Sequence, residues 1–161
     1  MARVLIVGGG CRGRRLASGL VAGGHAVRIT TRTQDGRAGI EAAGAECWIG
    51  TPDRIGSLRY ALENVSLLMW LLGTASGARE LHGRRLEFML SQTIDTTVRG
   101  VIYEAAGSVP SGAAVVREWA ALNRVPCRIL ESDPADRAAW LAEAVVAVDQ
   151  LLGGGRRGGA R

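Results

Sequence analysis

A short apolar segment followed by spaced glycines restricts the fold of this chain more than any other feature. Residues 3–7 are mostly aliphatic, and they lead into Gly8-x-Gly10-x-x-Gly13 and then into a helix predicted over 13–23. A strand, a glycine-rich turn and a helix N-terminus in this order are typical of a dinucleotide-binding crevice. In such a crevice Gly8 permits the tight turn, Gly10 lets the backbone approach a pyrophosphate, and Gly13 lets the helix pack close to the strand. The alternative is an ordinary turn in a glycine-rich chain.

Predicted strands and helices alternate along the rest of the sequence. The strands are expected at 3–7, 26–31, 46–49, 65–71, 98–103 and 127–130, and the helices at 13–23, 35–43, 53–62, 79–93, 111–123 and 134–152. For the last helix, Asp133 is the expected N-cap and Pro134 the first helical residue. Six such units predict the α/β class: a doubly wound, mostly parallel six-stranded sheet with helices on both faces, the Rossmann arrangement.

The composition predicts a single domain without membrane or metal partners. We expect one dinucleotide-binding domain over residues 1–152 and a disordered Gly/Arg tail over 153–161, which has too few apolar residues to pack. The longest apolar run, 67–72, is too short to span a membrane. The three cysteines show no metal-ligand spacing, and no signal peptide is visible. These features favour a cytoplasmic protein with reduced thiols.

The positive charge gives little support to nucleic-acid binding. All 20 basic residues are arginine, and three of them lie in the tail, whereas the net charge of the whole chain is only +5. Because the remaining basic residues are diffuse, no specific nucleic-acid partner is expected. The absence of lysine also excludes every mechanism that needs a lysine side chain.

The end of the second predicted strand favours NADP over NAD. NAD sites usually place an acid there, about 20 residues after the glycines, whereas this chain has Thr31-Arg32-Thr33 and its first acid, Asp35, lies beyond. A guanidinium suits a 2′-phosphate, and Arg12 is a candidate for a second phosphate contact. The alternatives are that Arg32 is simply solvated, or that the loop binds FAD or S-adenosylmethionine. The predicted cofactor-binding residues are Gly8, Gly10, Cys11, Arg12, Gly13, Thr31, Arg32, Gly73 and Thr74.

Two further segments carry a family resemblance. Residues 24–28 read Gly-His-Ala-Val-Arg, and residues 44–50 read Gly-Ala-Glu-Cys-Trp-Ile-Gly. Together with the arginine at the strand end, they resemble the NAD(P)-binding epimerase/dehydratase group and its NmrA-like relatives, the extended and atypical short-chain dehydrogenases. The resemblance covers residues 3 to about 73. It implies a Rossmann domain that binds NAD(P).

The chain departs from that group at two points. The group commonly has Gly-Asp after the third strand, where this chain has Gly50-Thr51. Its catalytic members use a tyrosine with a lysine four residues on, and neither Tyr60 nor Tyr103 has that partner. The resemblance therefore supports the cofactor crevice more than the usual Tyr-Lys proton relay.

Three other side chains are weak catalytic candidates. Tyr103 and Glu104 end the fifth strand, near Ser108, and Glu104 serves as a general acid or base if burial raises its pKa. An exposed loop acid is the favoured interpretation of Glu104. His82 is placed to face the nicotinamide, although a solvated histidine at a helix start is favoured.

Two classes of function remain open from the sequence. One is a small oxidoreductase acting on a small-molecule substrate, with the hydride supplied by the cofactor. The other is a non-catalytic NADP(H)-sensing or accessory subunit, which the missing lysine favours. A homodimer that completes the site is a further possibility left open.

Overall fold

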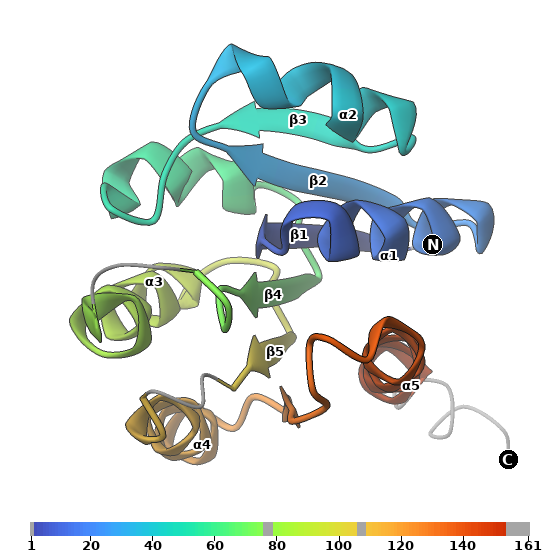
Figure 1. The fold of residues 1–161 in the computed structure, drawn as a ribbon. Helices are drawn as coiled ribbons and strands as arrows, with labels where there is room; N and C mark the ends of the chain where they lie inside the picture. Colours follow the sequence, from blue (N-terminus) through green and yellow to red (C-terminus); the bar gives the residue numbers. More distant parts are fainter. Residues whose placement is uncertain (1, 76–78, 106–108, 154–161) are drawn as a thin grey trace, which may run out of the picture.

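The computed structural model describes residues 2–75, 79–105 and 109–153, which form a parallel sheet between two layers of helices (Figure 1). The sheet has six strands in the order β3-β2-β1-β4-β5-β6, and every neighbouring pair is parallel. The strands are β1 Arg3–Gly8, β2 Ala26–Thr31, β3 Glu46–Ile49, β4 Leu67–Leu71, β5 Gly100–Glu104 and β6 Cys127–Leu130. The predicted doubly wound α/β fold is confirmed.

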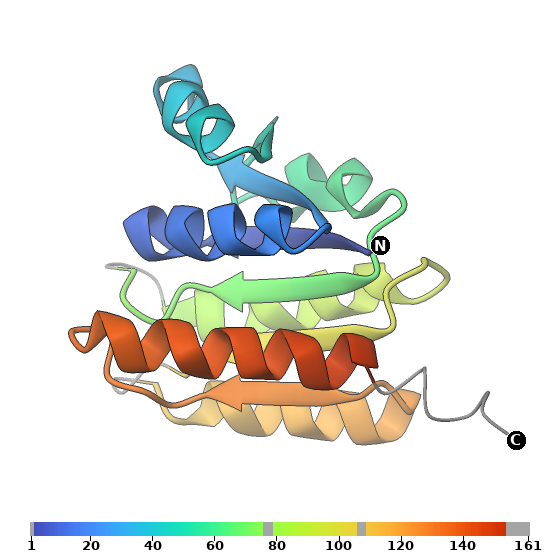
Figure 2. The same cartoon turned by 90° about the vertical axis from the view of Figure 1, so that its right-hand side faces the viewer.

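The helices divide between the two faces of the sheet (Figure 2). The α-helices are α1 Gly10–Ala22, α2 Arg37–Ala42, α3 Arg84–Thr93, α4 Ser111–Asn123 and α5 Arg137–Gly153, and the 3-10 helices are η1 Gln34–Gly36, η2 Ile55–Leu62 and η3 Arg79–His82. Apolar residues of α1, α2 and α5 pack on one face, and those of η2, α3 and α4 pack on the other.

Strand β1 shows why the sheet is buried on both faces. Its side chains alternate, so Val4 and Ile6 join the core under α1 and α5, while Leu5 and Val7 join the core under η2 and α3. All four are fully buried. A near-continuous aliphatic run is what a parallel strand covered on both faces requires.

The strand order reverses beside β1, which pairs with β2 on one side and with β4 on the other. In open α/β sheets, the crevice at such a reversal lies outside the carboxyl ends of the strands and is the usual ligand site. The loops after β1, β4 and β5 therefore meet at one edge.

Four helix predictions need correction. Helix α1 begins at Gly10 rather than at residue 13. The helix predicted over 53–62 is the 3-10 helix η2, the one over 35–43 divides into η1 and α2, and the one over 79–93 is interrupted at Gly83, which separates η3 from α3.

Helix α5 also begins later than predicted, directly after a second aspartate. The Asp133 carboxylate accepts a hydrogen bond from the Ala135 N–H at 2.9 Å, within a turn that precedes the helix. The Asp136 carboxylate accepts from the Ala139 N–H at 3.2 Å and so caps the first helical turn. Pro134 therefore lies in the preceding turn.

Membrane-spanning helices and metal clusters are both absent from the described residues. None of the helices in 2–75, 79–105 and 109–153 is long and apolar enough to cross a membrane. Within the same ranges, no group of three or more histidine, cysteine or acidic side chains is placed to hold a metal ion. Of the predicted tail, Gly153 ends α5, and residues 154–161 lie outside the described residues.

Candidate functional site

The glycine turn after β1 leads directly into α1. Gly8, Gly9 and Gly10 all have positive φ, at 84°, 88° and 50°, a region that side chains other than glycine disfavour. The Gly9 N–H donates to the Leu71 carbonyl at 2.8 Å, which ties the turn to the end of β4. A Cβ on Gly13 would lie 3.1 Å from the Gly8 carbonyl oxygen. Glycine at 13 therefore permits the close approach of helix and turn.

The first turn of α1 presents free backbone donors at the crevice. Gly9 caps the helix without a side-chain hydrogen bond, and Gly13 is the first residue whose N–H reaches back, donating to the Gly9 carbonyl at 2.9 Å. Among the described residues, the N–H groups of residues 10–12 have no acceptor. Such groups, together with the positive end of the helix dipole, form an anion site.

A buried carboxylate joins three elements beside this turn. The guanidinium of Arg12 forms an ion pair with Glu104 and donates to the Thr74 hydroxyl at 3.1 Å. Glu104 also accepts hydrogen bonds from the Gly73 N–H and from the Trp140 indole N–H, each at 2.7 Å. The Arg12 guanidinium lies 4.6 Å from the centre of the Trp140 ring. We call these five residues the Glu104 cluster.

The favoured interpretation of Glu104 as an exposed loop acid is wrong, since the residue is 1% exposed. It ends the interior strand β5, and Trp140 of α5 contacts it from the neighbouring layer. A carboxylate is stable at such a depth only with a counter-charge and further donors, and here Arg12 and two N–H groups supply them. The lone pairs that a general base needs are therefore already engaged.

His82 and Tyr103 form a second buried pair next to this cluster. The Nδ1 atom of His82 lies 2.7 Å from the Tyr103 hydroxyl, and the two rings meet edge to face. The interpretation of His82 as solvated is wrong, because η3 packs against α3 and α4 and the residue is only 4% exposed. A Cβ at Gly112 of α4 would overlap the Tyr103 hydroxyl oxygen.

Burial keeps both groups of this pair neutral. It lowers the pKa of His82 below the usual 6.5, against smaller opposing effects of a hydrogen bond with the Leu72 backbone and of the Glu104 charge. Burial also raises the pKa of Tyr103 to about 12, and the negative charge of Glu104 acts in the same direction. Ser108, predicted at this edge, lies outside the described residues.

The other half of the crevice is open to solvent. Arg32 follows β2 with its side chain 63% exposed and forms an ion pair with Asp53 at 3.1 Å. The Thr31 hydroxyl donates to the Thr33 carbonyl at 3.3 Å. Asp53 also lies 3.7 Å from Arg85, and its side chain accepts from the Thr51 hydroxyl at 3.3 Å. The loop after β3 thus carries an acid two residues after Thr51, and this acid is paired with Arg32.

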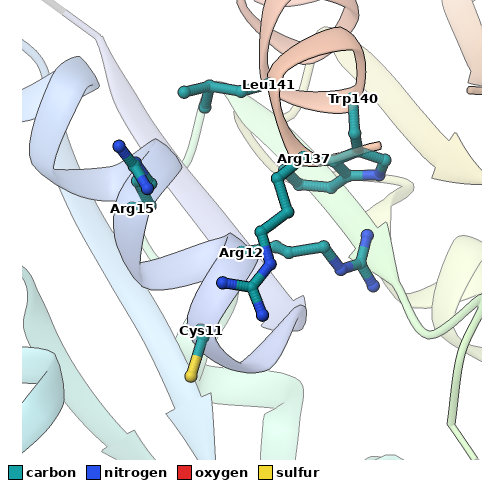
Figure 3. A pocket seen from close by; sticks show the side chains of 6 residues that line it. All are labelled: Cys11, Arg12, Arg15, Arg137, Trp140 and Leu141. Atoms are coloured by element: carbon teal, nitrogen blue, oxygen red, sulfur yellow. The ribbon is translucent and has the colours of Figure 1, made fainter. Parts of the chain in front are cut away.

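A pocket of about 200 Å³ lies between α1 and α5 (Figure 3). Its lining consists of Cys11, Arg12, Arg15, Arg137, Trp140 and Leu141. Cys11 and Arg12 are among the predicted cofactor-binding residues, whereas Arg15 and the partners from α5 are not. No local pattern joins residues more than 120 positions apart; only the packing of α5 beside α1 brings them together.

Neither a family model nor a curated protein matches this sequence. Solved structures do match, at low sequence identity. Triphenylmethane reductase from Citrobacter sp., complexed with NADP(H), has a TM-score of 0.65 at 16% identity, over 81% of this chain and 49% of that protein. An anaerobillin reductase from Escherichia coli has a TM-score of 0.63 at 14% identity, over 80% of this chain and 71% of that protein.

An epimerase gives a similar result. UDP-glucuronic acid 4-epimerase from Bacillus cereus, in complex with NAD, has a TM-score of 0.60 at 11% identity, over 79% of this chain and 55% of that protein. This chain therefore spans about half the length of that epimerase and of the triphenylmethane reductase. Reductases and an epimerase are the kinds of protein that the sequence resemblance indicates. At these identities the likeness establishes the Rossmann fold.

Proposed function

We propose that this chain binds NADP(H) at the carboxyl edge of β1 and β4, as a member of the epimerase/dehydratase-like group. The observation that carries the proposal is the glycine turn, which leaves the backbone N–H groups of residues 10–12 without acceptors at the N-terminus of α1. A Cβ at Gly10 would have no atom within 4 Å, so the backbone is open there. Free donors beside open space suit a pyrophosphate.

Arg32 supports a preference for NADP over NAD. Its ion pair with Asp53 is exposed, and exposed pairs contribute only about 0–1 kcal/mol. A 2′-phosphate carries more charge than a carboxylate and accepts several hydrogen bonds from a guanidinium, so it competes well for Arg32. The triphenylmethane reductase is complexed with NADP(H) and the epimerase with NAD. Since the fold serves both cofactors, the preference depends on Arg32.

Within this proposal, a reductase takes its hydride from NADPH, and the protein only has to orient the substrate. Binding without turnover, as in a sensor or accessory subunit, is the second candidate. It is favoured by the state of Tyr103, Glu104 and His82, which are buried and engaged in fixed hydrogen bonds. The single domain over 1–152, the cytoplasmic location and the homodimer remain predictions.

Calorimetric titration with NADPH, NADH, FAD and S-adenosylmethionine tests the cofactor. We expect NADPH to bind most tightly, and Arg32→Ala to weaken NADPH binding about tenfold or more with little effect on NADH. Arg37→Ala is the matched control, because Arg37 is an arginine on the neighbouring helix α2 whose side chain is 42% exposed. Equal losses for both cofactors contradict the 2′-phosphate contact.

Turnover is tested separately, by following NADPH oxidation with a panel of carbonyl and conjugated aromatic substrates. Oxidation that depends on a substrate supports the reductase. Tight NADPH binding without oxidation by any of them supports the sensor or accessory role.

A further inference from the structure

The pocket between α1 and α5 gathers positive charge into a small space. Arg12 and Arg15 enter it from α1, and Arg137 enters from α5 and extends toward α1 (Figure 3). Three arginine side chains line about 200 Å³, so the pocket attracts anions. Arg15 and Arg137 are exposed and therefore accessible to an anionic ligand.

Only one of the three arginines that line the pocket has an acidic partner among the described residues. Glu104 neutralises Arg12. Among the described residues, Arg15 and Arg137 have neither a hydrogen bond nor an ion pair through their side chains, and the pocket lining contains no acid. The pocket therefore keeps two uncompensated positive charges.

The start of α1 adds to this potential, whereas the Asp136 carboxylate caps the start of α5. The first turn of α1 contains no acidic residue. Instead, Arg12 lies in the first turn of α1, and Arg137 is the first residue of α5. A cation is unfavourable at the positive end of a helix dipole, and departures from such local preferences concentrate at functional sites.

The rest of the lining is apolar. Leu141 is partly exposed, whereas Trp140 is only 1% exposed and its ring is covered by the Arg12 guanidinium. A bare inorganic ion would leave Leu141 in contact with water. The lining instead suits a ligand with a charged end and an apolar end.

We propose that this pocket binds a small organic anion, a phosphate ester or carboxylate with an aromatic or aliphatic group. Its charge lies between Arg15 and Arg137, and its apolar group lies against Leu141. The site goes beyond NADP(H) binding and does not depend on it. The dinucleotide would use the backbone N–H groups of residues 10–12, whereas this pocket uses side chains on the α5 side of α1.

Calorimetric titration with phenyl phosphate, in the absence of any dinucleotide, tests the proposal. Inorganic phosphate carries the charge alone and phenol the ring alone, so both are expected to bind more weakly than phenyl phosphate. Arg15→Gln and Arg137→Gln should each weaken phenyl phosphate binding about tenfold or more, since each removes a charge-assisted contact. Both side chains are at the surface without partners among the described residues, so the variants should fold normally, which circular dichroism checks.

Arg99→Gln is the matched control. Arg99 is an exposed arginine just before β5, at the opposite edge of the sheet, and its removal should leave binding unchanged. Cys11 gives a local readout, because it is an exposed thiol in the lining. Phenyl phosphate should slow the alkylation of Cys11 by iodoacetamide, and Arg137→Gln should abolish that protection.

Three results would overturn the proposal. These are no binding of phenyl phosphate, an equal loss in Arg99→Gln, or displacement by NADPH combined with no effect of Arg137→Gln, which would place the anion in the dinucleotide crevice. A protein that binds phenyl phosphate through Arg137 but binds no dinucleotide would support this site and contradict NADP(H) binding. The two proposals therefore fail independently.

Discussion

Two arginine–carboxylate pairs lie at the carboxyl edge of the sheet, and they differ in their exposure to water. The side chains of Arg12 and Glu104 are 13% and 2% exposed, whereas those of Arg32 and Asp53 are 63% and 38% exposed. The first pair connects α1, β5 and α5, and the second connects two loops. An arginine–carboxylate pair therefore holds the structure together in the buried half of the crevice. In the exposed half, the carboxylate of the pair can be replaced by a ligand.

The difference follows from the cost of removing a charge from water. Glu104 needs Arg12 and two neutral donors, because an unpaired buried carboxylate is strongly unfavourable. Asp53 remains solvated whether or not Arg32 is beside it. A ligand phosphate can consequently replace Asp53 at little cost but cannot replace Glu104.

Removing the buried counter-charge should have the largest effect on stability. We expect Arg12→Met to lower the free energy of unfolding by about 3–5 kcal/mol, because Glu104 is left buried without its cation. Urea denaturation measures the change. The double variant Arg12→Met/Glu104→Gln should recover much of the loss, since the stranded charge is then gone. A loss below about 1 kcal/mol in the single variant would mean that the pair behaves as an exposed one.

The free energy of unfolding should also fall at alkaline pH, because Tyr103 is buried. The pKa of Tyr103 is raised from 10.0 to about 12, so the folded state holds the proton more tightly than the unfolded state. The resulting stabilisation is complete below pH 10 and is lost as the pH rises toward 12, in total about 2–3 kcal/mol. Tyr103→Phe should remove this loss in denaturant titrations across that range. Tyr60→Phe, at a tyrosine that is 70% exposed, should leave the alkaline loss in place.

The smallest effect on stability is expected in the exposed half. Asp53→Asn should change the free energy of unfolding by about 1 kcal/mol or less. It also frees Arg32 for a phosphate, so NADPH should bind a few-fold more tightly while NADH binding stays the same. Asp35→Asn is the control, since Asp35 is an exposed acid nearby. A destabilisation as large as that of Arg12→Met would remove the distinction between the two pairs.

The fold was predictable because its signals are local. Strands β2, β3 and β6 have the bounds predicted from apolar runs, and the glycine turn lies where its spacing indicates. The start of α5 could not be predicted, because Asp133 and Asp136 lie close together and both provide a capping carboxylate. The sequence alone does not decide between two such caps.

The candidate site was less predictable because its contacts are long-range. The burial of Glu104 depends on Arg12, 92 residues earlier, and on Trp140, 36 residues later. Asp53 was missed because the acid expected after β3 was sought at position 51, and its pairing with Arg32 joins loops that follow two different strands. Pairing of side chains across elements depends on the packed structure rather than on spacing in the chain.

The contact between Gly112 and Tyr103 restricts the order in which this chain can change during evolution. A Cβ at position 112 would lie 2.7 Å from the Cζ atom of the Tyr103 ring, in addition to overlapping its hydroxyl. Any lineage that keeps the tyrosine must therefore keep the glycine. Loss of the ring at position 103 removes this overlap, so a change at 103 makes a later change at 112 easier.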